Sequence, residues 1–367
     1  MPDTKTKKDT TKVLFDRDKR TILESVAQAQ FIAFAPYVFQ ASVILRDSGA
    51  LRHLEQQGDK GATINEIAAH IDMSHYAARV LLEASLGIGL AFRKDGKYYL
   101  TKTGDIFINN RMTRINTDFM RDVCYDGAQD LKDSLTDGKP RGLRHLGDWD
   151  TIYQGLDTMR QPARNSWFAF DHHYSDNVFR EALSLIFEKP VTNILDIGAN
   201  TGKWALQCLA HDPNVRMGLV DLPGLLGIAE QTVTNAGYRE RVTLHPTDML
   251  DTTTTLPAGY DVIFMSQFLA CFADEEILAI LQKCHRALPE NGRIFVNDTF
   301  WDRQRLEASA FSLQMTSLYF TSMANGNSQM YDSEVYVNLI KRAGFEIVRF
   351  FDKVGYTHTL FELRKSA

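Results

Sequence analysis

The sequence lacks any uninterrupted apolar run of about 18 residues, the length that a membrane-spanning helix requires. Residues 1–20 are rich in Lys, Asp and Thr and contain no apolar core, which excludes a secretory signal peptide. We therefore expect no membrane segment, no membrane partner, and a disordered start over residues 1–20.

Cysteine is scarce and is not arranged for a structural role. Cys124, Cys208, Cys271 and Cys284 form no C-x-x-C pair and lie near no close pair of histidines. This spacing predicts neither a metal site nor a disulfide framework. Four free thiols suit a reducing compartment, so the expected location is cytoplasmic.

An excess of positive charge is also missing. The 41 Lys and Arg residues are outnumbered by 46 Asp and Glu residues, and the net charge is -5. Such a chain has no general attraction to nucleic acid or to an anionic membrane. At 367 residues it is too long for a single hydrophobic core, so two domains are expected.

The N-terminal part has the pattern of a small helical domain with a hairpin. Apolar residues recur at helical spacing over 20–54, in a number larger than one monomer face covers, so part of this surface should contact another chain. A capping box at 63–66 predicts a helix over 64–71, and Ser74 begins another that reaches Leu86. Two short strands within 90–101 flank a turn sequence. The order predicts a winged helix.

A winged helix suggests DNA binding, but the charge of the second helix argues against it. Arg79 is its only cation, and Glu83 lies in the same face region. Insertion into a DNA groove requires cations that neutralise phosphates. We therefore expect no nucleic-acid partner and keep a DNA-binding regulator only as an alternative.

A ligand-binding turn follows the strand that begins at Val191. The strand ends at Asp196, Gly198 and Gly202 form a tight turn, and a helix comes next. The dinucleotide fingerprint fails at Asn200, and the spacing of a P-loop is one residue short. Asp221 ends the second strand about 20 residues later, where an acid binds ribose hydroxyls. A nucleoside without phosphates fits this pattern best.

This stretch resembles motif I of the class I S-adenosylmethionine-dependent methyltransferases, acid-x-Gly-x-Gly-x-Gly, with Asn200 in place of the middle glycine. From about Phe31 to its end, the chain resembles the plant-type small-molecule O-methyltransferases. The resemblance implies an α/β fold: a Rossmann-like class I methyltransferase sheet with an N-terminal all-helical, winged-helix domain that forms a homodimer. It also implies S-adenosyl-L-methionine as the cofactor.

The resemblance further implies a set of cofactor-binding residues, with Asp221 at the ribose, Asp248 at the adenine amino group and Met249 packed on the ring. The complete set is Asp196, Gly198, Asn200, Gly202, Asp221, Leu222, Asp248, Met249, Ser266 and Gln267. Further strands are expected over 242–245, 260–265 and 293–297, and a late hairpin from 345–350 and 357–363.

The catalytic part of the resemblance is altered. The family's general-base histidine falls on Ala270, its second acid falls in 325–331, where no acid occurs, and only the acid that orients the histidine is kept, as Asp298. Three interpretations stay open. His172, His173 or Asp298 takes the proton, or the acceptor is acidic or carbon-centred and needs little base strength, or the chain binds cofactor without catalysis.

Two aromatic stretches are candidates for the acceptor pocket. Residues 167–174 combine aromatic and titratable side chains directly before a predicted helix over 175–187, and 311–320 with Met323 is rich in Phe, Leu, Met and Tyr. Both suggest a small apolar or aromatic acceptor. The expected activity is O-methylation, with C-methylation of an activated phenol ring as the alternative enzymatic reaction.

The expected domain division follows from these patterns. It comprises a disordered segment (1–20), a winged-helix dimerisation domain (21–108), a helical connector lining the active site (109–187) and a cofactor-binding methyltransferase domain (188–367).

Overall fold

The structure, a computed structural model, describes residues 14–366 and divides the chain into two units. One unit is Asp16–Met120, and the other contains everything from Arg121 onward. The predicted disordered segment lies outside the described residues up to position 13, and residues 14–20 form turns, bends and irregular backbone.

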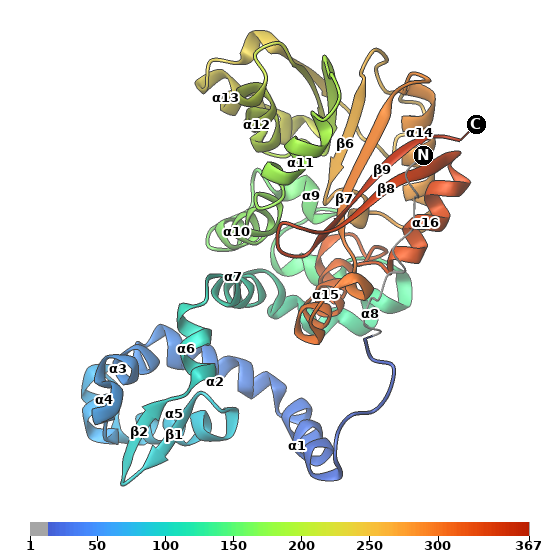
Figure 1. The fold of residues 1–367 in the computed structure, drawn as a ribbon. Coiled ribbons are helices and arrows are strands. Elements are labelled where there is room, and N and C mark those ends of the chain that lie inside the picture. Colours follow the sequence, from blue (N-terminus) through green and yellow to red (C-terminus); the bar gives the residue numbers. More distant parts are fainter. Residues whose placement is uncertain (1–13, 367) are drawn as a thin grey trace, which may run out of the picture. The chain divides into compact units, whose positions relative to one another are not determined.

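The first unit is helical apart from one hairpin (Figure 1). Its helices are α1 (Ile22–Ala33), α2 (Ala35–Asp47), α3 (Ala50–Gln57), α4 (Ile64–His70), α5 (His75–Ile88), α6 (Lys102–Asn109) and α7 (Arg111–Phe119), and its strands are β1 (Ala91–Lys94) and β2 (Lys97–Leu100). The predicted capping box is present, because the Thr63 side chain accepts from Glu66 N and the Glu66 carboxylate accepts from Thr63 N. The two predicted helices and the hairpin are therefore formed.

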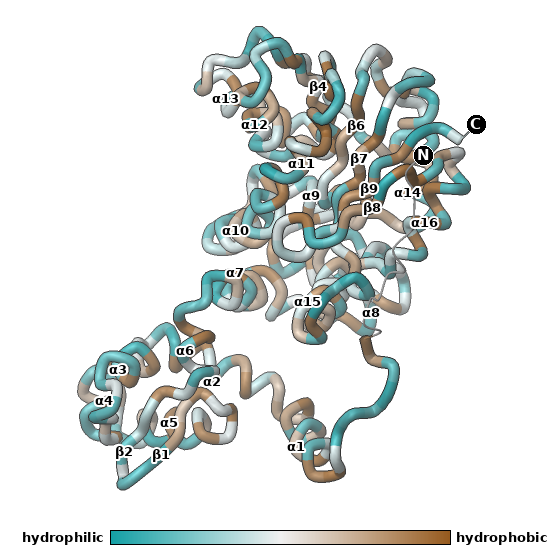
Figure 2. Tube along the Cα trace, in the orientation of Figure 1, coloured by the Kyte–Doolittle hydropathy of each residue, from teal (hydrophilic) through white to brown (hydrophobic). Residues whose placement is uncertain are grey.

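The first helix of this unit has no buried residue. Figure 2 shows apolar stretches along the trace of α1. The apolar side chains that are exposed on α1, on α2 and between them are Ile22, Leu23, Val26, Phe31, Ile32, Phe34, Tyr37 and Ile44. Among the described residues, no single helix has both the length and the apolar character to cross a membrane, whereas α1 and α2 together, with a 74° bend between them, meet that test.

The second unit is built on a seven-stranded sheet with the order β5-β4-β3-β6-β7-β9-β8. Its strands are β3 (Asn193–Ile197), β4 (Arg216–Asp221), β5 (Val242–Pro246), β6 (Val262–Ser266), β7 (Arg293–Thr299), β8 (Phe345–Val354) and β9 (His358–Lys365). The first five are parallel, and β8 and β9 form the predicted late hairpin, with β9 pairing antiparallel to β7. This is the expected Rossmann-like α/β arrangement.

Helices cover both faces of this sheet and bury it (Figure 1). The helices α11 (Phe179–Ile186), α12 (Lys203–His211) and α13 (Pro223–Asn235) pack on one face, and α14 (Asp274–Ala287) and α16 (Ser333–Arg342) pack on the other. The same unit also contains α8 (Leu131–Asp137), α9 (Ile152–Gly155), α10 (Ala163–Ser175) and α15 (Glu307–Tyr319). Successive strand residues face opposite cores: Leu195 packs with residues of α14 and α16, and Ile194 packs with residues of α11, α12 and α13. Burial on both faces explains the nearly continuous apolar runs of these strands.

One helix boundary differs from the prediction. The helix expected over 175–187 begins at Phe179, and residues 167–174 lie within α10 rather than before a helix. Residues 175–177 are polar and add no apolar residue at helical spacing. Residues 167–174 continue α10, whose buried side includes Trp167 and His173.

The strand order places a ligand crevice beside β3. The chain runs from β3 outward through β4 and β5, and then returns to add β6 and β7 on the other side of β3. In open α/β sheets, ligands bind at the carboxyl ends of the strands where the order reverses. That edge is where the predicted site residues lie.

Candidate active site

The turn after β3 adopts the conformation that motif I requires. Gly198, Asn200 and Gly202 have φ values of 79°, 50° and 78°. A Cβ atom added to Gly198 would lie 2.4 Å from Phe268 Cδ2. Asn is one of the few non-glycine residues that populate the left-handed region readily, so Asn200 replaces the middle glycine while keeping the same backbone path.

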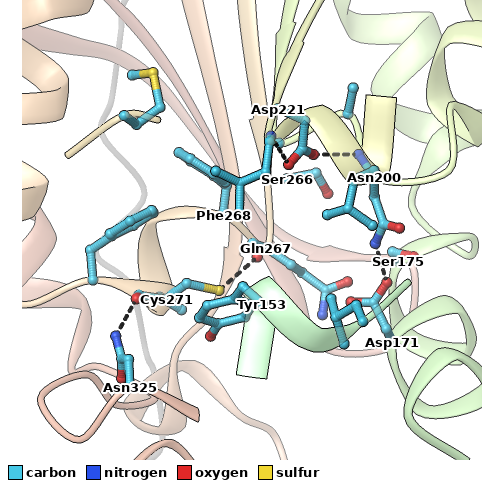
Figure 3. Close-up of a pocket in the computed structure, with 18 of the residues that line it drawn as sticks. Tyr153, Asp171, Ser175, Asn200, Asp221, Ser266, Gln267, Phe268, Cys271 and Asn325 are labelled. Carbon is cyan, nitrogen blue, oxygen red and sulfur yellow. Dashed lines mark hydrogen bonds between the residues drawn. The ribbon is translucent and has the colours of Figure 1, made fainter. Parts of the chain in front are cut away.

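Asp221 closes this turn from the end of β4. Its Oδ2 accepts a hydrogen bond from Asn200 N and its Oδ1 accepts one from Leu222 N, each at 2.8 Å (Figure 3). Burial raises the pKa of Asp221 to about 6, against the lowering effect of these two backbone donors. The carboxyl is held rigidly at the mouth of the crevice.

A cavity of about 390 Å³ opens between the turn and the helical segments that cover it. The predicted site residues that line it are Asp196, Gly198, Asn200, Asp221, Leu222, Asp248, Met249, Ser266, Gln267, Ala270, Asp298 and His172. Two predicted residues are not among its lining. Gly202 begins α12, where an added Cβ would lie 3.2 Å from the Ala229 backbone, so this glycine permits helix packing rather than ligand contact.

The second of these residues is His173, which turns away from the cavity. It is buried, and its ring contacts the rings of Tyr174 and Tyr356. His172 does line the cavity, and burial together with the nearby Lys203 ammonium lowers the pKa of its imidazole to about 4. At neutral pH His172 is therefore uncharged and is a weak base.

Asp298 does not project a free carboxylate into the cavity. Its Oδ2 accepts from Ala270 N at 3.2 Å and from the Tyr336 hydroxyl at 2.9 Å, and its Oδ1 accepts from Thr299 N at 3.0 Å. Burial raises its pKa to about 6, partly offset by these donors. Asp298, which corresponds to the family's histidine-orienting acid, therefore accepts a hydrogen bond from the backbone N of Ala270, the residue at the position of that histidine.

Several buried hydrogen-bond acceptors on residues that line the cavity have no partner among the described residues. Asp196 Oδ2, Asn200 Oδ1 and Gln267 Oε1 have no hydrogen-bond partner within residues 14–366. Burial also raises the pKa of Asp196 far above its ordinary value. Unpaired buried acceptors are costly unless a ligand supplies donors or positive charge. S-adenosylmethionine carries both a sulfonium and an ammonium cation, so these residues fit it.

Comparison with known proteins identifies two domain families in this chain. The model of the O-methyltransferase domain matches residues 159–346, and that of a Dimerisation2-like domain matches residues 27–98. The chain belongs to the O-methyltransferase domain family. It is an S-adenosylmethionine-dependent methyltransferase.

Individual relatives of this methyltransferase are distant. An L-tyrosine C(3)-methyltransferase from Streptomyces lavendulae is 24% identical over 303 residues, which cover 81% of each chain. A 3-amino-4-hydroxybenzoate 4-O-methyltransferase from Streptomyces cremeus is 29% identical over 220 residues, covering 53% of this chain and 58% of that protein. The crystal structure of the methyltransferase SibL superposes with a TM-score of 0.70 at 24% identity, over 93% of this chain and 100% of that one.

Several lining residues of the methyltransferase were not among the predicted site residues. The lining also includes Tyr153, Trp167, Phe170, Asp171, Cys271, Tyr319, Phe320, Asn325 and Met330. Trp167 Nε1 donates to the Tyr319 hydroxyl at 2.8 Å, which ties α10 to α15. Both aromatic stretches thus contribute to the wall, although Phe311 is exposed and Met323 is buried outside the lining.

Asp171 is the missed residue with the most chemistry. It lies on α10, and its Oδ2 accepts a hydrogen bond from Asn200 Nδ2 at 2.9 Å. Burial, with the nearby Asp176 carboxylate, raises its pKa to about 7. Its place in the titratable cluster 167–174 was the only signal in the sequence, and that signal did not distinguish it from His172 or His173.

Proposed function

We propose that this enzyme methylates a small phenol and that the atom methylated is a ring carbon next to the hydroxyl group. The observation that carries this choice is the similarity over 81% of this chain to a tyrosine C(3)-methyltransferase, and the alanine at position 270, where the related O-methyltransferases have a histidine, is compatible with it. A phenol ionises more readily than an alcohol and needs only a modest base, and its ring carbon is then nucleophilic.

The cavity supports an aromatic acceptor. Its acceptor half is walled by Trp167, Phe170, Tyr319 and Phe320, whose faces and edges suit another ring. Polar atoms are few on this wall, as is usual for a small-molecule site in which a few groups set orientation. Asn325, in the segment where an acid was expected, donates from Nδ2 to Cys271 O at 2.6 Å and holds the loop after β6.

The cofactor, when bound, supplies an electrophilic methyl group on a sulfonium. We infer that Asp221 binds the ribose hydroxyls and that Asp248 and Met249 lie at the adenine. The unpaired acceptor atoms of Asp196, Asn200 and Gln267 would then hold the cationic end, and the amides at the start of α12 would favour the carboxylate. Leu222, Ser266 and Gly198 complete the lining on this side, where the missing side chain of Gly198 leaves room for the Phe268 ring.

The test is turnover on a panel of phenols. L-tyrosine deuterated at both ring positions beside the hydroxyl group, tyramine, catechol and 3-amino-4-hydroxybenzoate are each incubated with cofactor, and the products are analysed by mass spectrometry. Ring methylation exchanges one deuterium for a methyl group in the labelled tyrosine. A methylated product that keeps both deuterium atoms would contradict ring methylation, and release of S-adenosylhomocysteine with none of the phenols would contradict the whole proposal.

Methylation on the phenolic oxygen is the second candidate. The family description and the similarity to a 4-O-methyltransferase favour it. O-methylation also requires a group that accepts a proton, because the attacking oxygen must lose its hydrogen. The deuterium measurement separates the two reactions.

We also propose that residues 21–108 are a winged-helix dimerisation domain and that the enzyme is a homodimer. The Dimerisation2-like match and the exposed apolar side chains of α1 and α2 support this. Residues 109–187 then form the connector whose helices α9 and α10 line the site. All four cysteines are free thiols, which supports a location in the cytoplasm.

A further inference from the structure

A phenol acceptor requires a proton acceptor near its hydroxyl group, and this inference rests on the function proposed above. The three predicted bases are poorly placed for that task. Asp298 is occupied by donors from Ala270, Thr299 and Tyr336, the His172 imidazole is a weak base, and His173 does not line the cavity. The base must come from elsewhere in the lining.

Asp171 has the placement that the others lack. Its side chain is 22% exposed and lines the same cavity as Ala270. Oδ2 accepts from Asn200 Nδ2, while Oδ1 has no hydrogen-bond partner among residues 14–366. One oxygen is thus anchored and the other is available, which is the arrangement that a directed carboxylate base requires.

The anchor for Asp171 is the residue that departs from motif I. Asn200 donates from its backbone N to Asp221 and from its side chain to Asp171, so it bridges the cofactor side and α10 (Figure 3). A glycine at this position would adopt the same φ of 50° but would offer Asp171 no donor. Ala270 and Asn200, two departures from the family's pattern, line the same cavity.

We propose that Asp171 accepts the proton of the acceptor's hydroxyl group and that Asn200 is a positioning residue that orients its carboxylate. The O–H electron pair is delocalised to the neighbouring ring carbon, which forms the bond to the methyl group as the carbon–sulfur pair stays on sulfur. The ring carbon then loses its hydrogen as a proton to water, and Asp171 returns its proton to the oxygen. One proton is released overall.

The electrostatic surroundings agree with this role. The groups that face Asp171 are Asp176, Asp221, Lys203 and His172, with Tyr153, Tyr319 and Cys271 across the cavity. Burial and the carboxylates raise its pKa to about 7, and the Lys203 ammonium and the Asn200 amide oppose that rise. A base with a pKa near the working pH is close to optimal.

The test compares three variants on a phenol that the parent methylates. Asp171→Asn keeps the shape of the side chain but removes the base, and kcat should fall at least ~10²-fold while affinity for S-adenosylhomocysteine stays unchanged. Asn200→Gly removes the donor that stabilises the carboxylate, so its rate should fall and the acid limb of its pH profile should move to higher pH.

Asp176→Asn, at the residue that follows α10, is the matched control. Asp176 does not line the cavity, and its charge raises the pKa of Asp171, so this variant should keep kcat at high pH and move the acid limb to lower pH. A purely structural role for Asp171 would not produce opposite shifts in these two variants.

Four results would overturn the inference. The first is a full rate in Asp171→Asn, and the second is a loss of S-adenosylhomocysteine affinity in that variant with kcat kept, which would make Asp171 a cofactor ligand. The third is a pH profile that neither Asn200→Gly nor Asp176→Asn moves, and the fourth is a parent enzyme that methylates no phenol. The last result rejects the proposed function itself before any variant is compared. If Asp171→Asn does not fold, the pH profile of Asn200→Gly decides.

Discussion

Replacement of Asp221 by alanine tests the cofactor half of the site directly. In the structure this carboxylate accepts 2.8 Å hydrogen bonds from the backbone N of Asn200 and of Leu222, and in the proposed complex it also accepts from the ribose. Hydrogen bonds to a charged group are worth ~1.5–3 kcal/mol each. We expect Asp221→Ala to weaken cofactor binding by ~1.5–3 kcal/mol, or about 10- to 100-fold.

The assay is calorimetric titration with S-adenosylhomocysteine, which binds without turnover. Asp251→Ala is a suitable control, because Asp251 is a fully exposed acid that accepts bonds from Thr253 and Thr254 and lies outside the cavity. The control should bind like the parent. An affinity of Asp221→Ala within about twofold of the parent would refute the placement of the ribose.

The pH dependence of the same titration adds a second measurement. The pKa of Asp221 is raised to about 6 in the free protein, and donors from the ribose favour the ionised form. Affinity should therefore be constant well above pH 6 and should fall as the pH drops through that value. The decline should be shallower in Asp221→Ala, and equally steep profiles would show that another group is responsible.

Three further outcomes are expected. Ile32→Glu puts a charge on an exposed apolar face of α1 and should convert the proposed homodimer to a monomer in sedimentation velocity, so an unchanged dimer would place the interface elsewhere. Gly198→Ala places a Cβ 2.4 Å from Phe268 Cδ2 at a φ of 79° and should lower the free energy of unfolding by ~2–4 kcal/mol in denaturant titration. Gly227→Ala is the control, because Gly227 lies on a helix with open space around its Cα, and this variant should raise the free energy of unfolding slightly. Burial lowers the pKa of His358 to about 3, so the stability that depends on its neutral form is complete above about pH 6.5 and is lost as the pH falls. Between pH 7 and 5 the free energy of unfolding of the parent should therefore fall by ~2 kcal/mol more than that of His358→Leu, and equal decreases would contradict this.

Local features could be predicted because their determinants are neighbours in the chain. The turn at 196–202, the acid at the end of the next strand and the capping box at 63–66 are each specified by a few consecutive residues or by one repeat of strand, helix and strand. Asn200 has the left-handed backbone that glycine would adopt at this position of the motif, a conformation that is also open to asparagine.

The identity of the base could not be predicted in the same way. His172 and His173 are adjacent in sequence, but successive residues on a helix point about 100° apart, so only one of them lines the cavity. Asp298 is aligned with the family's acid, yet its protonation and its contacts depend on Tyr336, which comes from a helix 38 residues further along the chain.

The sequence by itself predicted the strand, turn and helix around residues 196–202, since these follow from periodicity and from the short-range rules of turns, and its resemblance to the methyltransferase motif indicated the family and the cofactor. Only the tertiary structure shows which carboxylate lines the proposed acceptor side of the cavity with one oxygen that has no hydrogen-bond partner among residues 14–366. Asp171 meets Asn200 across 29 residues of sequence, and its surroundings come from α10, α12 and the end of β4. The pKa and the direction of a buried side chain depend on such long-range contacts, and no local pattern encodes them.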